Sequence, residues 1–426
     1  MSGLALAQAP PPTRPLRWLL ASPLWGLVAG VWLLLHGETA VLDRWSPHAV
    51  VLVHLFTLGV LGNAMLGSLL QFLPVAADSV LPWAPAAGAL HLLFNLGLAL
   101  FVPAFAGSRT EWLPVASALL ALPLIGFAAA TLPVLVRRGA QGVLRAGIAF
   151  ALAMLVLTVL AALLLVAALR GALVVPLERL TDLHALSGLL GWVVALMAAV
   201  GSITLPMFQG TAPVPPRWLS RWLQLTATGL LAGGVLSFAL DDQAVLVFAT
   251  APSLLAFVGV SLGLPWRRRH ARNPVLTAFW RSGTLALAGA GLTAMAVALE
   301  LLPARAGLLA GMLGIGIGLP LMLTGMMLEI TGFLCWIDLR RRCPRGQRIP
   351  GTGSLLEERD KRLALYAHLL CAAALVAAAI WPALARPAGI GLLLAHAGTL
   401  ACILAGLWRA RVFLRHAAVG AHGESS

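Results

Sequence analysis

Long apolar runs recur from one end of the chain to the other, each about 18 residues or longer and separated by short polar breaks. Inside a bilayer no water is available to satisfy backbone N–H and C=O groups, so such runs must form helices. Charged residues make up only 10% of the chain, whereas a soluble globular protein carries about 25%. A transmembrane β-barrel would need stretches of roughly ten alternating apolar and polar residues, and these runs are continuous. The sequence therefore predicts an all-α membrane protein.

Twelve transmembrane helices fit within the 426 residues. We expect them at 18–36, 49–77, 83–106, 112–136, 143–169, 181–210, 219–240, 244–264, 276–301, 306–337, 362–384 and 388–413. Residues 18–413 would then form a single transmembrane domain, with a disordered tail at 1–17, a second tail at 414–426 and an Arg-rich loop at 338–361. The first run lacks an A-x-A cleavage signal, which argues against a removable signal peptide.

The positive charges indicate which way the chain crosses the membrane. If the N-terminus is cytoplasmic, 23 of the 29 Lys and Arg residues fall in inner segments and six in outer segments. This imbalance follows the positive-inside rule. It predicts a multi-pass protein of the bacterial inner membrane with both termini in the cytoplasm. It also accounts for the net charge of +14, so we expect no nucleic-acid partner.

The predicted helices at 49–77 and 181–210 share a motif. Each carries a histidine, a hydroxyl residue three positions later, and then Leu-Gly, Gly-Ser and Leu-Pro pairs. These are His54, Thr57, Leu61-Gly62, Gly67-Ser68 and Leu73-Pro74 in the first helix, and His184, Ser187, Leu190-Gly191, Gly201-Ser202 and Leu205-Pro206 in the second. The two helices lie four spans apart, which suggests three quasi-repeats of four helices. The helix at 306–337 would be the third member; it is glycine-rich but lacks the histidine.

Three histidines are predicted to lie in the outer leaflet: His54, His184 and His396. Several helices that each supply one histidine at one depth can build a haem or metal site in a bundle. We therefore predict that these three residues bind haem b or copper, with Gly188 and Gly191 leaving one face of His184 open to a flat ligand. In the alternative, each histidine donates a hydrogen bond to a neighbouring helix. The hydroxyl that follows each histidine, such as Thr399, could bond its own backbone or support an imidazole.

A second group is predicted in the inner leaflet and comprises His91, Glu329, His368 and Cys371. Ionisable groups at membrane depth often carry protons or bind cations, which would suit a proton-coupled secondary transporter. His368 and Cys371 share a helix face, and soft sulfur ligands suit Cu(I). Packing within the bundle is the alternative for this group.

The motif helices resemble a known family. The fragments Thr57-Leu-Gly59, Gln71-Phe-Leu-Pro74, Leu190-Gly-Trp192 and Leu205-Pro-Met-Phe208, within twelve helices in three repeats, resemble haem–copper oxidase subunit I and the NnrS-type proteins linked to nitric oxide and denitrification. By this resemblance His54 stands where the oxidases place a low-spin haem ligand, and His184 lies on the helix that carries a copper ligand. The His-Pro-x-x-Tyr pattern, the histidine pair of the seventh helix and both histidines of the tenth are absent. The resemblance thus implies an accessory protein rather than an oxygen reductase.

From these observations we expect an inner-membrane protein that binds haem or copper and acts in nitric oxide or respiratory stress handling. We assign it no catalytic residues. The expected surroundings are the lipid bilayer and a respiratory or denitrification complex. A proton-coupled transporter of a small solute, and a structural relic that assembles with a respiratory complex, are the alternatives.

Overall fold

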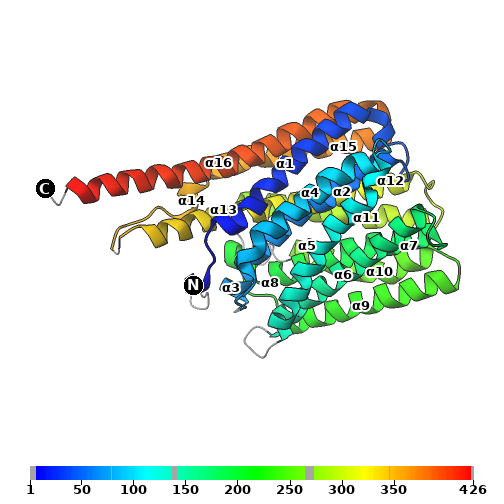
Figure 1. Ribbon diagram of the computed structural model, residues 1–426, viewed down its shortest axis with the longest axis horizontal. Helices are drawn as coiled ribbons and strands as arrows, with labels where there is room; N and C mark the ends of the chain where they lie inside the picture. Colours follow the sequence, from blue (N-terminus) through cyan, green and yellow to red (C-terminus); the bar gives the residue numbers. More distant parts are fainter. Residues whose placement is uncertain (1–5, 78, 137–141, 264–272, 345, 424–426) are drawn as a thin grey trace.

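The computed structural model describes residues 6–77, 79–136, 142–263, 273–344 and 346–423, and in this part of the chain it contains helices and no strands (Figure 1). Eleven helices in these ranges are long and apolar enough to cross a membrane. The one remaining expected helix, at 276–301, corresponds to α11 (Pro274–Ala298), which packs among them but carries Arg281 and is less apolar. The predicted fold class, an all-α polytopic membrane bundle, is confirmed.

The helices fall into three successive units of the same order, in which the second helix of each unit is built from three consecutive segments. The first unit contains α1 (Thr13–His36), α2 (Pro47–His54) with η3 (Leu55–Gly62) and α3 (Asn63–Ala76), α4 (Ala87–Phe105) and α5 (Leu113–Val136). The second contains α6 (Gly142–Leu169), α7 (Leu177–Leu186) with η6 (Ser187–Val194) and α8 (Ala195–Gln209), α9 (Pro216–Ala239) and α10 (Ala244–Gly263). The third contains α11, α12 (Ala306–Gly311) with η8 (Met312–Gly318) and α13 (Leu319–Arg342), the short α14 (Thr352–Leu355), α15 (Glu358–Ile380) and α16 (Ala385–Gly423).

The second helix of every unit is interrupted by a π-helical stretch, namely η3, η6 or η8. A π turn accommodates an extra residue in an α-helix, and such turns are frequent at functional sites. In each unit the first helix packs against this stretch: α1 against η3, α6 against η6 and α11 against η8. The repeat inferred from two motif helices is therefore visible in all three units, including the one without the histidine.

The three units close into a ring. α5 packs against α6, α10 against α11, and α16 returns to pack against α1. The spans that contain η3 and η6 are the two most buried, with 72% and 67% of their most apolar stretch enclosed by protein. The second helices of the first two units thus lie inside the bundle, where their side chains meet other helices rather than lipid.

The ends of the chain are more ordered than the sequence suggested. The predicted disordered tail at 1–17 is wrong from Leu6 onward, because Ala9 is buried and Arg341 donates hydrogen bonds to the carbonyls of Ala9 and Pro10. The predicted loop at 338–361 is helical in part, since α13 continues to Arg342 and α14 and the start of α15 follow. The predicted tail at 414–426 is helical through the end of α16, at Gly423, and its last three residues lie outside the described ranges. Figure 1 shows both termini at the same end of the bundle, beyond which α16 and α13 extend.

Candidate functional site

His54 ends α2 and directly precedes the π turn η3. Its Nδ1–H donates a hydrogen bond to the carbonyl of Val50, at 2.8 Å. Because a carbonyl can only accept, Nδ1 must carry the proton and a neutral imidazole keeps its lone pair on Nε2. The ring lies 4.8 Å from that of Phe101 on α4. His54 is thus oriented by its own helix and presents Nε2 as a free ligand atom.

His184 lies on α7, shortly before the π turn η6. Its Nδ1–H donates to the carbonyl of Thr158 on α6, at 3.0 Å. The hydroxyls of Thr158 and Ser187 are 3.1 Å apart, and Ser187 in turn donates to the carbonyl of His184. This network fixes the ring against α6 and again leaves Nε2 as the atom with the lone pair.

The two imidazoles face each other across the boundary between the first and second units. Their ring centroids lie 6.3 Å apart and their planes differ by only 18°. The helix of His54, α2, packs against η3 and α4 of its own unit, and the helix of His184, α7, packs against α6, η6 and α9 of the second unit. It is therefore the two side chains that meet across the boundary between the units. Both residues are half-buried. Across the same boundary, Arg44, which lies between α1 and α2, forms an ion pair with Asp182 at 3.0 Å.

The glycines near His184 serve a different purpose from the one expected. A Cβ at residue 188 would lie 3.1 Å from Thr158 Cγ2, and one at residue 191 would lie 2.9 Å from Met154 Cγ. The prediction that these glycines leave room for a flat ligand is therefore wrong, because side chains of α6 fill that space. Any ligand of His184 must approach from the His54 side.

His396 is placed with His368, not with the other two predicted outer histidines. The ring centroids of His368 and His396 are 5.4 Å apart, with the planes at 71°. The prediction that these two residues lie in opposite leaflets is wrong, because α15 and α16 form an antiparallel hairpin and residues equally far from its turn meet. α1 packs against both α16 and η3, so it separates His396 from the His54–His184 pair.

The hydroxyl residues of the motif bond the backbone of their own helices. Thr57 donates to Val53 at 2.9 Å, and Thr399 donates to Ala395 at 3.2 Å. Ser187 behaves likewise, as described above. Local backbone bonding thus accounts for Thr57 and Thr399, whereas Ser187 combines a backbone bond with its contact to Thr158 beside His184.

The remaining members of the predicted inner group are dispersed. Glu329 on α13 forms an ion pair with Lys361 on α15, at 2.7 Å, and the two side chains are only 11% and 9% exposed. His91 on α4 meets the edge of the Trp18 ring at a centroid distance of 4.8 Å. Lys361 is the single lysine of the chain, and its pairing with Glu329 joins two helices of the third unit.

A polar cluster that the sequence analysis did not single out lies inside the first unit. The side-chain amides of Asn63 and Asn95 donate to each other, at 3.1 and 3.2 Å, and Trp25 Nε1–H donates to Asn95 Oδ1 at 2.5 Å. Asn63 also donates to the carbonyl of Gly59, within the π turn. Polar residues inside apolar runs were the available signal, since they are costly in a membrane unless paired. The cluster ties α1, α3 and α4 together beside η3.

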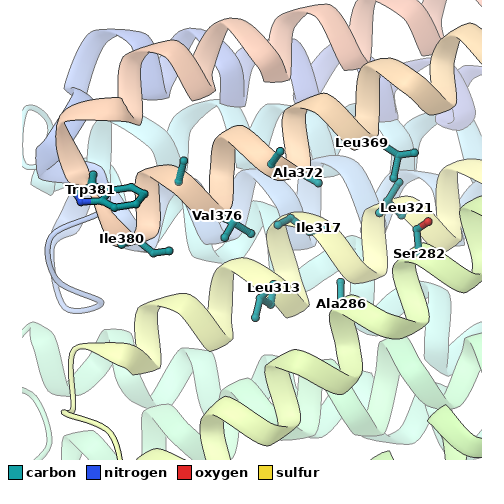
Figure 2. Close-up of a pocket in the computed structure, with 12 residues that line it drawn as sticks. Ser282, Ala286, Leu313, Ile317, Leu321, Leu369, Ala372, Val376, Ile380 and Trp381 are labelled. Carbon is teal, nitrogen blue, oxygen red and sulfur yellow. The ribbon is translucent and has the colours of Figure 1, made fainter.

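An open apolar groove of about 480 Å³ runs between α11, the η8–α13 helix and α15 (Figure 2). Figure 2 shows Ser282 and Ala286 on one side, Ile317 and Leu321 at the floor, and Trp381 at one end. Ser282 supplies the hydroxyl in an otherwise hydrocarbon lining. Such a lining suits contact with lipid acyl chains.

Among the residues that the structure describes, no three His, Cys, Asp or Glu side chains are arranged to hold a metal ion together. Comparison of the chain with protein families and with curated proteins finds no match in either. The two histidine pairs and their surroundings are therefore the features of the molecule that bear on its function.

Proposed function

We propose that this protein is a membrane accessory protein that holds one haem between His54 and His184. The observation that carries the proposal is the near-parallel pair of imidazoles, each with Nδ1 bonded to a backbone carbonyl and Nε2 free. Two imidazoles bound on opposite sides of one metal at about 2.0–2.1 Å would have ring centroids roughly 6–6.5 Å apart. The observed 6.3 Å separation fits this requirement.

The donor set favours haem over a bare metal ion at this position. Copper and zinc sites in proteins usually draw three or four ligands from side chains. The described residues around His54 and His184 offer two. A haem would bring four porphyrin nitrogens of its own, so the protein would need to supply only the imidazoles of His54 and His184. A pair of imidazoles with no third partner therefore fits haem better than copper.

A haem with two histidine ligands transfers electrons and senses redox state, whereas activation of a gas needs an open position on the iron. A role in nitric oxide or respiratory stress handling, beside a respiratory or denitrification complex in a bacterial inner membrane, extends the same proposal. The protein would then pass or sense electrons, and loss of one imidazole would open the iron to nitric oxide.

The test is a reduced-minus-oxidised visible spectrum of the protein purified in mild detergent from cells that supply haem. We expect a Soret band with sharp α and β bands, and near one haem per chain. His54→Ala, His184→Ala and the double variant should lose the bound haem while still inserting into the membrane. His91→Ala is the matched control, because it removes another membrane histidine outside the pair. Full haem content in the double variant would disprove the assignment.

The transporter alternative depends on Glu329 as a coupling group. That carboxylate is held by Lys361 at 2.7 Å in a largely buried ion pair, which gives it a structural partner. No observation favours transport over the haem proposal.

A further inference from the structure

We infer that His368 and His396 form a second, separate site in the third unit that binds a single Cu(I) ion, with the thiol of Cys371 as third ligand. The site lies between α15 and α16 and is distinct from the His54–His184 pair. The inference does not depend on the proposed haem.

His368 is oriented as a ligand and lacks a partner. Its Nδ1–H donates to the carbonyl of Ala364 at 2.9 Å, so Nε2 holds the lone pair. That atom is buried without any hydrogen-bond partner, and the whole residue is 6% exposed. An unpaired buried acceptor is costly, which points to a further group that satisfies it.

His396 completes the pair from the neighbouring helix. It is 2% exposed, and its ring lies 5.4 Å from that of His368 at 71°. The ring packs against Gly26 of α1. A Cβ at that residue would lie only 2.1 Å from His396 Cγ, so the position of the ring depends on the glycine. Three helices thus confine the two imidazoles to one place.

The cavity beside the two rings limits what can bind. It has a volume of about 10 Å³ and is lined by His368, His396, Cys371 and apolar side chains. A space of this size holds roughly one water molecule or one ion. A haem or an organic ligand is too large. Ile317, Leu321 and Ala372 line both this cavity and the groove of Figure 2, and form the wall between them.

The chemistry of the lining favours Cu(I). A thiolate is a soft donor that selects this ion, and imidazole also suits copper. Zinc would need a fourth ligand, and with one thiolate it would leave a net positive charge among apolar side chains, which is unfavourable. Cu(I) with one thiolate is neutral. Binding of Cu(I) here would account for three features found at one place: the Cys371 thiol, the small cavity and the unpaired Nε2 atom of His368.

Binding requires a small rearrangement and one proton. The Sγ atom of Cys371 lies against Gly391 of α16, 3.7 Å from where a Cβ at that residue would be. The three side chains do not already converge as ligands, so Cys371 would have to rotate about its Cα–Cβ bond to reach the ion. A Cu–S bond then forms as the S–H bond breaks, and the proton leaves to solvent. Copper remains monovalent throughout, so no oxidant or reductant is needed.

The experiment titrates the purified chain with Cu(I) alone, without oxygen, against the chromogenic chelator bicinchoninate. Wild-type protein should take up one Cu(I) per chain at this site. Affinity should fall more than about 100-fold in His368→Leu/His396→Leu and about tenfold in Cys371→Ser. His91→Gln and Cys402→Ser are matched controls, since they alter other membrane histidine and cysteine residues, and both should bind normally. His54→Ala/His184→Ala should also bind copper, which separates this inference from the haem proposal.

X-ray absorption of the wild-type copper complex provides a second reading that does not depend on how the variants fold. We expect two nitrogen neighbours and one sulfur. Equal copper uptake by wild type and the double histidine variant would overturn the inference, and so would a water molecule alone bridging the two rings in a structure of copper-supplied protein. A copper complex without sulfur, unchanged in Cys371→Ser, would overturn the role of the thiol.

Discussion

At the scale of single residues, three membrane histidines are oriented in the same way. His54, His184 and His368 each donate Nδ1–H to a backbone carbonyl. This bond fixes the tautomer and the direction of the ring, which is the usual preparation for ligation through Nε2. The backbone bond that the sequence offered as an alternative to ligation is therefore compatible with it, because each imidazole has two nitrogens.

The Glu329–Lys361 pair leads to a prediction about stability. Lys361→Met would leave the Glu329 carboxylate without its partner in a largely buried place, and removing one member of such a pair costs about 3–5 kcal/mol. The double variant Glu329→Leu/Lys361→Met should recover most of this loss. Unfolding in mixed detergent micelles measures both.

The control for this prediction is Arg362→Ala. Arg362 pairs with Glu358 at 2.9 Å on the surface, where the two side chains are 53% and 48% exposed. An exposed pair contributes about 0–1 kcal/mol. If Lys361→Met were no more destabilising than Arg362→Ala, the pair would have no structural role.

At the scale of elements, the π turn is the feature that distinguishes the second helix of each unit. In the first unit it lies between His54 and Asn63. It therefore sets the angle between the ring that faces His184 and the amide that bonds Asn95. An ordinary α-helix with one residue fewer would not present both side chains in these directions.

Deletion of Leu58 tests this role. Removing one residue from η3 should restore α-helical pairing and change the rotation of His54 relative to Asn63, because π-helical and α-helical turns contain different numbers of residues. We expect the protein to insert and to lose its haem. Leu58→Ala, which keeps the helix length, should retain haem. Equal haem content in both variants would show that the π turn does not direct His54.

At the scale of the whole molecule, the chain forms a closed ring of three units in which α16 returns to α1. Each unit contains an even number of long helices, so successive units begin on the same side of the membrane. Both termini accordingly lie at one end of the bundle (Figure 1). The Arg-rich segments around α13 and α16 are at this end too.

This arrangement predicts where the termini lie in the cell. Green fluorescent protein fused to either end should fluoresce, because the positive-inside rule assigns that end of the bundle to the cytoplasm. Alkaline phosphatase at the same positions should be inactive, while its fusion to the outer loop near Arg44 should be active. An active phosphatase at either terminus would reverse the orientation.

Much of this fold follows from local patterns. The apolar runs predict the membrane helices because each run must satisfy its own backbone in lipid. The motif shared by the helices of His54 and His184 predicted the repeat. The ends of helices were harder to predict from the sequence. The part of α16 that extends beyond the bundle is stabilised by contacts between segments that are distant in the sequence. Arg409, for example, bonds the carbonyl of Leu355 and the carboxylate of Asp360.

The sequence by itself determined that the chain is a helical membrane bundle and which histidines lie within it, since both depend on the identity of neighbouring residues. Only the tertiary structure decided which histidines meet. Depth along a helix gives one coordinate, whereas contact also depends on the order of helices around the ring and on their rotation. The same depth argument that united His54 with His184 wrongly added His396, which a hairpin turn places against His368.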